Sequence, residues 1–120
     1  MNDRKKVLII DDEVDLCQLL KSYFLKKNFE VFLSHNLKDG ISVLETSDPD
    51  IVFLDNNLPD GSGWQLAVQI AEQHPEIYIT LISGYYPQVP PMPEKARYNV
   101  IEKPVSFSDL DKNIQQYNAA

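Results

Sequence analysis

The stretch Val7-Leu8-Ile9-Ile10-Asp11-Asp12-Glu13 runs from four apolar residues directly into three acidic ones. A short, continuous apolar run of this kind is typical of a strand that is buried on both faces of a sheet. A second apolar run, Ile51 to Leu54, also ends in an acid, Asp55. Two predicted strands therefore carry carboxylates at their carboxyl ends.

Similar short runs recur along the whole chain. The predicted strands are Val7 to Ile10, Val31 to Leu33, Ile51 to Leu54, Ile77 to Ile82, and Val100 to Ile101. Segments with helical periodicity lie between them, and a last one, Phe107 to Tyr117, is opened by Ser106 and Asp109 at capping-box spacing. Apolar strands that alternate with helices predict an α/β fold with a doubly wound, five-stranded parallel sheet and helices on both faces. The expected strand order is the flavodoxin-like 2-1-3-4-5.

One stretch breaks the alternation where a fourth helix is expected. Residues 87 to 93 carry four prolines, and each removes a backbone donor and disfavours helix at the residue before it. We therefore expect the fourth helix to be short or irregular, with at most a turn near Glu94 to Arg97.

Composition excludes several classes of function. The 120 residues are 43% hydrophobic and 24% charged, which predicts one folded domain over residues 1–120. A formal net charge of -7 is the wrong sign for a polyanion, so we expect no direct binding to nucleic acid or to anionic membranes. The single cysteine permits no intramolecular disulfide, and the first apolar run is too short for a signal peptide or membrane span. A cytoplasmic protein is expected, and the position of Met1 near the first strand favours a true N-terminus.

The polar residues after four strands together predict a phosphoryl-accepting site. The carboxyl ends of parallel strands meet at one edge of a sheet, so Asp11, Asp12 and Asp55 are expected to crowd one pocket. Oxygen ligands without histidine or cysteine favour Mg²⁺. A carboxylate can also attack a phosphoryl group as a nucleophile, and Asp55 is the candidate. Lys103, after the last strand, and Ser83, after the fourth, would then contact the phosphoryl oxygens.

Each of these residues also has a purely structural explanation. The acids after the first strand suit a helix N-terminus, and Asp55 and Ser83-Gly84 suit turns. An isolated lysine such as Lys103 is usually a solvated surface group. The combination, in this order and at these strand ends, favours the site over the separate explanations.

With these motifs the sequence resembles the receiver domain of two-component response regulators. The matching segments are Val7 to Glu13, Ile51 to Asp55, Leu58-Pro59-Asp60-Gly61, Ile82-Ser83-Gly84 and Lys103-Pro104. The resemblance spans nearly the whole chain and implies a single receiver domain. It also implies that Asp11 and Asp12 bind Mg²⁺, helped by the Asp55 carboxylate and the backbone carbonyl of Asn57.

The resemblance further implies how the site is used. Asp55 would accept a phosphoryl group from a histidine on a partner kinase or phosphotransfer protein, and Lys103 would contact that group. Ser83 would be the switch hydroxyl, acting on an output protein or effector domain that the sequence does not name. The bond between Lys103 and Pro104 would be cis.

Two departures from the family pattern concern the output. Val100 occupies the position, three residues before the lysine, that usually holds an aromatic residue of the switch; Tyr98, Tyr85 or Tyr86 are conceivable substitutes. The proline-rich stretch replaces the helix that contributes to the usual output and dimer surface. We therefore expect phosphorylation chemistry with an unorthodox output.

The remaining distinctive residues have structural interpretations. Cys17 sits among leucines and predicts a buried structural thiol. His35 and His74 occur in no ligand or triad spacing, and surface positions are expected for both. Trp64, near Ser62 and Gln65 at capping-box spacing, is expected to pack in the core.

Three functions compete on this basis. The first is a phosphoacceptor signalling domain with at most slow self-dephosphorylation, and not an enzyme. The second is a receiver-like interaction module that does not switch, which Val100 and the proline-rich stretch favour. The third is an enzyme on a similar fold: a flavin carrier, disfavoured because Asp11 and Asp12 stand where an anion cradle is needed, or an aspartate-nucleophile phosphatase, for which no cap segment is evident.

Overall fold

A computed structural model describes residues 4–84 and 89–119 of the chain. Its main feature is a five-stranded parallel sheet in the order β2-β1-β3-β6-β7. The strands are β1 (Lys6–Ile10), β2 (Glu30–Ser34), β3 (Ile51–Asp55), β6 (Tyr78–Ser83) and β7 (Arg97–Glu102). The predicted flavodoxin-like order 2-1-3-4-5 is confirmed.

Two further strands, β4 (Asn57–Leu58) and β5 (Gly61–Ser62), form a separate antiparallel hairpin. The sequence indicates only a turn at Leu58-Pro59-Asp60-Gly61, because two-residue strands are too short to produce an alternating pattern. The hairpin stands directly after Asp55 and leads into the next helix.

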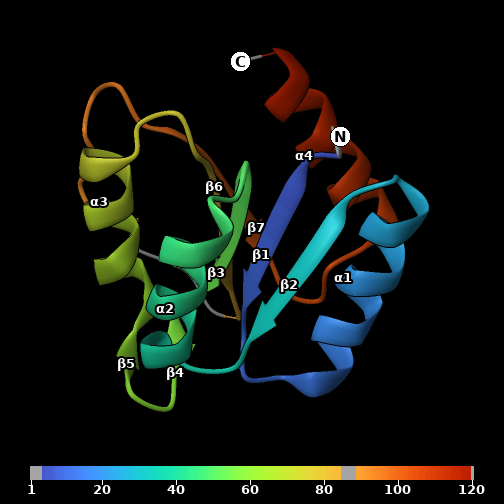
Figure 1. Ribbon diagram of the computed structural model, residues 1–120, viewed down its shortest axis with the longest axis horizontal. Coiled ribbons are helices and arrows are strands. Elements are labelled where there is room, and N and C mark those ends of the chain that lie inside the picture. The colour runs from blue at the N-terminus through green and yellow to red at the C-terminus, as the bar shows by residue number, and fades with distance from the viewer. Residues whose placement is uncertain (1–3, 85–88, 120) are drawn as a thin grey trace.

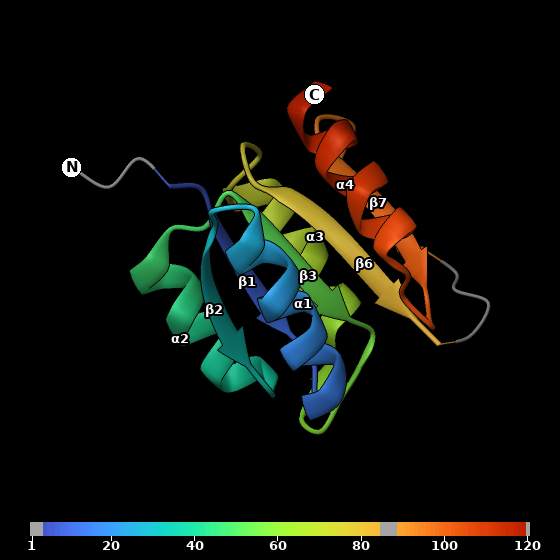
Figure 2. The ribbon, with the colours of Figure 1, turned by 90° about the vertical axis from the view of Figure 1, so that its right-hand side faces the viewer.

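Helices cover both faces of the sheet, as predicted (Figure 1). On one face lie α2 (Leu37–Ser47) and α3 (Gly63–Gln73), and on the other lie α1 (Val14–Lys26) and α4 (Phe107–Ala119). Figure 2 looks onto the face that carries α1 and α4. No helix within residues 4–84 and 89–119 is both long and apolar enough to cross a membrane.

Strand β1 shows why the apolar runs are continuous. Leu8 and Ile10 pack in the core beneath α2 and α3, whereas Val7 and Ile9 pack in the core beneath α1 and α4. All four side chains are fully buried. Alternating side chains of one strand therefore serve two cores, which requires every position to be apolar.

The capping box predicted for the last helix is present. The backbone N–H of Asp109 donates to Ser106 Oγ at 3.1 Å, and the backbone N–H of Ser106 donates to the Asp109 carboxylate at 3.0 Å. The apolar face of α4 packs on the core through Leu110, Ile114 and Tyr117, as its periodicity predicts. Two residues differ from this pattern: Phe107 is 59% exposed and Asn113 is fully buried. Asn113 is accommodated because its side-chain amide donates to Thr80 in β6 and Asn99 in β7.

The proline-rich segment forms no helix in its described part, residues 89–96. The predicted turn is present: the N–H of Ala96 donates to the carbonyl of Pro93 at 2.9 Å, with Glu94 and Lys95 between them. The prolines leave few donors for a helical ladder. Residues 85–88, which include two of the tyrosines considered above, lie outside the described part of the chain.

Gly63, the first residue of α3, lies against the backbone at the end of β3. A Cβ atom at Gly63 would lie 1.9 Å from the backbone carbonyl oxygen of Asp55, whereas one at Gly84 would meet no described atom within 4 Å. We expect Gly63→Ala to lower the free energy of unfolding by about 3 kcal/mol, because backbone must move to admit the methyl group. Gly84→Ala is the matched control and should change it by less than about 1 kcal/mol. Urea unfolding measures both, and equal stability of the two variants would contradict this packing.

Candidate functional site

The carboxyl ends of four strands bring the predicted site residues together. Asp11 and Asp12 follow β1, Asp55 ends β3, Ser83 ends β6 and Lys103 follows β7. A pocket of about 370 Å³ lies at this edge of the sheet. It is lined by Asp12, Glu13, Asp55, Asn56, Asn57, Ser83, Gly84 and Lys103. Asp11 lies beneath it, fully buried.

Asp11 is fixed by the turn that joins β1 to α1. Its backbone N–H donates to the Ser34 carbonyl at 3.0 Å, and its Oδ1 accepts the N–H of Glu13 at 2.8 Å. The other carboxylate oxygen, Oδ2, is buried without a hydrogen-bond partner in the described structure, and lies 3.4 Å from Lys103 Nζ. Burial raises the pKa of Asp11, against the opposing effects of the Glu13 N–H and the Lys103 charge.

Asp55 is the second buried carboxylate, with 4% of its surface exposed. Burial, together with the charge of Asp11, raises its pKa to about 6, although Lys103 acts in the opposite direction. Its Oδ1 lies 3.6 Å from Lys103 Nζ. At neutral pH the group is therefore ionised but costly to keep ionised.

Lys103 is the cation that faces these acids. Its Nζ lies 3.0 Å from Glu13 Oε1, 3.4 Å from Asp11 Oδ2 and 3.6 Å from Asp55 Oδ1. Burial tends to lower the pKa of Lys103, but the hydrogen bond to Glu13 and the charges of Asp11 and Asp55 outweigh it, so the pKa is raised. The peptide bond between Lys103 and Pro104 is cis, as the family resemblance implies.

The loop after β3 is held at the pocket by Asn56, whose role the sequence did not indicate. The N–H of Asn56 donates to the Ile82 carbonyl, and its own carbonyl accepts the N–H of Gly63, each at 3.1 Å. Its side-chain oxygen accepts the Ser62 hydroxyl at 3.1 Å. These bonds fix the backbone on both sides of Asn57. The side-chain amide of a turn residue was the available signal.

Asp60 links the same loop to α2, a role that the sequence analysis did not assign to it. Its two carboxylate oxygens accept the N–H groups of Leu37 at 2.7 Å and Lys38 at 3.0 Å. These bonds hold the pKa of Asp60 below its ordinary value. A carboxylate at an adjacent helix N-terminus is a favourable arrangement, but sequence alone does not reveal which helix lies beside the turn.

The donor set fits a hard divalent cation. One carboxylate oxygen from each of Asp11, Asp12 and Asp55 lies within 4.8 Å of the others, and the unpartnered Oδ2 of Asp11 is buried there. All three ligand groups are carboxylates, the type that Mg²⁺ prefers, and the open pocket leaves room for retained waters.

The comparisons with known proteins identify the family. Residues 7–115 match the family described as the response regulator receiver domain. The chain belongs to this family.

Curated relatives of this receiver domain are longer proteins. The transcriptional regulatory protein YxdJ of Bacillus subtilis is 32% identical over 104 residues, which cover 85% of this chain and 45% of YxdJ. The response regulator protein PilR of Pseudomonas aeruginosa is 33% identical over 82 residues, or 68% of this chain and 18% of PilR. The chain thus spans less than half the length of these relatives.

Solved receiver structures have the same fold. A two-component response regulator from Clostridium difficile superimposes with a TM-score of 0.84, at 23% identity, covering 97% of both chains. The response regulator TrrA of Thermotoga maritima has been solved with Mg²⁺ and BeF, where the TM-score is 0.81 at 23% identity over 94% of this chain and 98% of TrrA. TrrA has also been solved with the histidine kinase ThkA, where the TM-score is 0.78 at 24% identity, covering 94% of this chain and 97% of the matched one.

The residues considered above for a switch lie partly at the pocket and partly in the core. Ser83 is 4% exposed and lines the pocket. Val100 is half-buried against the core beneath α2 and α3, and Tyr98 is 40% exposed. Of the described residues that line the pocket, none is aromatic. Tyr98 does not line this pocket, and the two other tyrosines lie outside the described residues.

The expectation for Cys17 is confirmed. The thiol is buried, with Sγ 3.2 Å from the Asp11 carbonyl oxygen. Burial, with the charges of Asp11 and Asp12, raises its pKa to about 12. The group is therefore a protonated thiol at neutral pH and a poor nucleophile.

Trp64 is buried with 4% exposure, as expected. Ser62 stands at the N-cap of α3, but its side chain makes no capping bond within the described structure because its hydroxyl donates to Asn56. His35 is exposed, as expected, and its Nδ1 lies 2.9 Å from the Asp11 carbonyl oxygen. His74 is partly exposed, with Nδ1 3.7 Å from Glu76.

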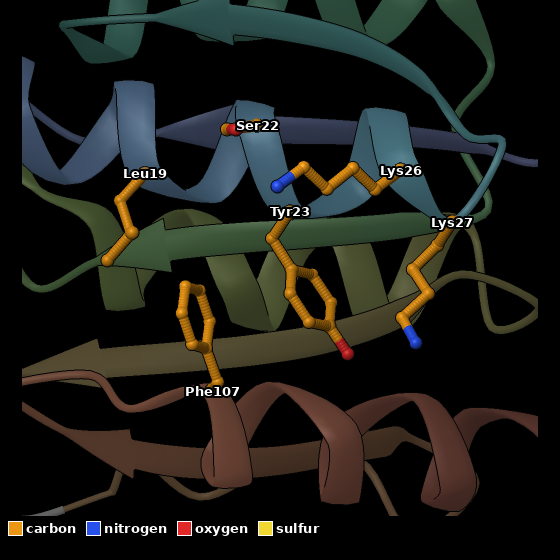
Figure 3. A pocket seen from close by; sticks show the side chains of 6 residues that line it. All are labelled: Leu19, Ser22, Tyr23, Lys26, Lys27 and Phe107. Atoms are coloured by element: carbon orange, nitrogen blue, oxygen red, sulfur yellow. The ribbon is translucent and has the colours of Figure 1, made fainter.

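An apolar surface continues from the site along α1. One pocket beside Lys103 is lined by Glu13, Leu16, Leu19, Lys103, Pro104 and Val105. A second one, between α1 and α4, is lined by Leu19, Ser22, Tyr23, Lys26, Lys27 and Phe107 (Figure 3). We call these two pockets, which share Leu19, the α1–α4 groove. The rings of Tyr23 and Phe107 stack in this groove, with their centroids 6.0 Å apart.

The raised pKa of Asp55 predicts that its ionised form lowers the free energy of unfolding. A carboxyl whose native pKa of about 6 lies above its ordinary 3.8 stabilises the fold only while protonated, so stability falls as pH rises through about 6. Without Mg²⁺, Asp55→Asn should therefore be more stable than the wild type by about 2 to 3 kcal/mol at pH 7.5. The difference should shrink as pH falls to about 4. Urea unfolding in EDTA checks this, and a difference that is independent of pH would contradict it.

Proposed function

We propose that this receiver domain is a phosphoacceptor signalling domain that carries its phosphoryl group on Asp55. The observation that carries the proposal is the pairing of a nearly buried, ionisable Asp55 carboxylate with the Lys103 ammonium at 3.6 Å, in a pocket open to solvent. Ser83 lines the same pocket and supplies a hydroxyl donor. The donor is a histidine on a partner kinase or phosphotransfer protein.

The transfer is a single displacement at phosphorus. A carboxylate oxygen of Asp55 attacks the phosphorus and forms the new O–P bond. The bond from phosphorus to the donor nitrogen breaks, and its electron pair stays on the imidazole, which then takes up a proton. Lys103 and Ser83 contact the phosphoryl oxygens, and Lys103 offsets the charge that arrives with them.

Mg²⁺ is the cofactor of this proposal. The carboxylates of Asp11, Asp12 and Asp55 and the backbone carbonyl of Asn57 would hold it. When bound, it neutralises charge on the phosphoryl oxygens. The hydrogen bonds of Asn56 and Asp60 keep the backbone of Asn57 at the pocket.

The α1–α4 groove supports docking of the donor protein beside Lys103. It offers exposed apolar surface at Leu19 and Phe107, which are 38% and 59% exposed, and it begins at the pocket itself. The Thermotoga receiver TrrA forms a complex with a histidine kinase, which is the class of partner proposed here. The proposed setting for this exchange is the cytoplasm.

Phosphorylation is proposed to alter partner binding, with slow self-dephosphorylation as the only hydrolysis. The alternative is a receiver-like interaction module that does not switch. It is favoured by Val100 at the usual aromatic position and by the absence of helix in residues 89–96. Binding of the same output partner by wild type and Asp55→Asn, whatever the phosphorylation state, would favour the module.

Acetyl phosphate tests the phosphoacceptor directly. We expect wild-type protein to gain one phosphoryl adduct in the presence of Mg²⁺, as read by intact mass, and to gain none in EDTA. Asp55→Asn should gain none in either condition, because the nucleophile has been removed. Asp48→Asn is the matched control: it removes the same charge at an exposed left-handed position that asparagine tolerates, and it should behave as wild type.

Two outcomes would contradict the proposal. Folded wild-type protein that gains no adduct with Mg²⁺ is not a phosphoacceptor. An adduct of equal yield on Asp55→Asn would move the acceptor to another residue.

A further inference from the structure

Glu13 holds Lys103 more closely than either buried aspartate does. The Nζ atom of Lys103 lies 3.0 Å from Glu13 Oε1, within hydrogen-bond distance, against 3.4 Å from Asp11 and 3.6 Å from Asp55. The side chain of Lys103 is 17% exposed and that of Glu13 is 57% exposed. Glu13 therefore draws the ammonium toward the mouth of the pocket.

Glu13 does not belong to the metal cluster. The acids of the described chain whose ligand atoms meet are Asp11, Asp12 and Asp55. Glu13 stands at the N-cap of α1, where its backbone N–H donates to Asp11 and its side chain makes no capping bond to the described helix. The helix N-terminus stabilises its negative charge, and the ion pair with Lys103 remains the main use of its carboxylate.

We propose that Glu13 is a latch that competes with the phosphoryl group for Lys103. The inference rests on the proposed function, since it concerns the same site. A phosphoryl group on Asp55 needs the Lys103 ammonium at its oxygens, and this ammonium must first leave Glu13. Glu13 also lines the pocket that receives the group, so its charge repels the incoming oxygens. Glu13 is thus a positioning residue that weakens the phosphorylated state.

Beryllofluoride, a phosphoryl mimic, reads this competition without covalent chemistry. In saturating Mg²⁺ at low ionic strength, Glu13→Gln should bind beryllofluoride about three- to fivefold more tightly than wild type, the size expected for loss of a partly exposed ion pair. The dissociation constant is measured by ¹⁹F NMR titration. Affinity for Mg²⁺ itself, measured without beryllofluoride, should stay within about twofold, because Glu13 is not a ligand.

Two further variants separate the effect of the Glu13–Lys103 contact from the effect of negative charge near the pocket. Asp15→Asn removes a charge from the first turn of the same helix, from an exposed residue that is not among those lining the pocket, and should bind beryllofluoride as wild type does. Glu13→Asp keeps the charge but shortens the side chain by one methylene, which weakens its contact with Lys103, so its affinity for beryllofluoride should lie between those of wild type and Glu13→Gln.

Each contrary result overturns the latch. Equal or weaker binding by Glu13→Gln shows that Glu13 does not compete, and tighter binding by Asp15→Asn shows a general charge effect. Wild-type behaviour of Glu13→Asp shows that the contact is irrelevant. Failure of the wild type to bind beryllofluoride at all, in protein that gains no adduct from acetyl phosphate, would count against the proposed function as well.

Discussion

Three carboxylates share one ammonium at the edge of the sheet, and the rest of the site depends on this imbalance. Lys103 Nζ lies within 4 Å of Glu13, Asp11 and Asp55, with Asp12 beside them. Burial, with a smaller contribution from the neighbouring like charges, raises the pKa values of Asp11 and Asp55. The site is therefore short of positive charge, and a divalent cation is the simplest way to supply it.

The packing and hydrogen bonds around the site hold this unfavourable cluster of charges in place. Strands β1 and β3 are neighbours in the sheet and are buried on both faces, so the residues that follow them have fixed positions. Gly63 lets α3 approach the Asp55 carbonyl more closely than any other residue allows. Asn56 and Asp60 tie the intervening loop to β6 and α2. Rigid surroundings of this kind keep a functional group in place.

The sequence predicted the sheet order and the strand-end residues because both follow from short-range patterns. Apolar runs identify buried strands, and parallel topology brings Asp11, Asp55, Ser83 and Lys103 to one edge. It did not predict the burial of Asn113, because that depends on hydroxyl and amide partners from two other elements. The contact between Glu13 and Lys103 was missed for the same reason: it joins residues 90 positions apart. The hairpin of β4 and β5 was too short to leave a pattern.

Asp11, Asp12 and Asp55 form the proposed cation site, and near pH 6 Asp55 is partly protonated until the cation binds. Calorimetric titration of Mg²⁺ at pH 6, in buffers of different ionisation enthalpy, measures both the binding and the number of protons released. We expect one Mg²⁺ per chain, with net release of protons because Asp55 has a pKa of about 6, and loss of binding in Asp11→Asn. Binding without proton release, or binding that Asp11→Asn leaves unchanged, would contradict this expectation.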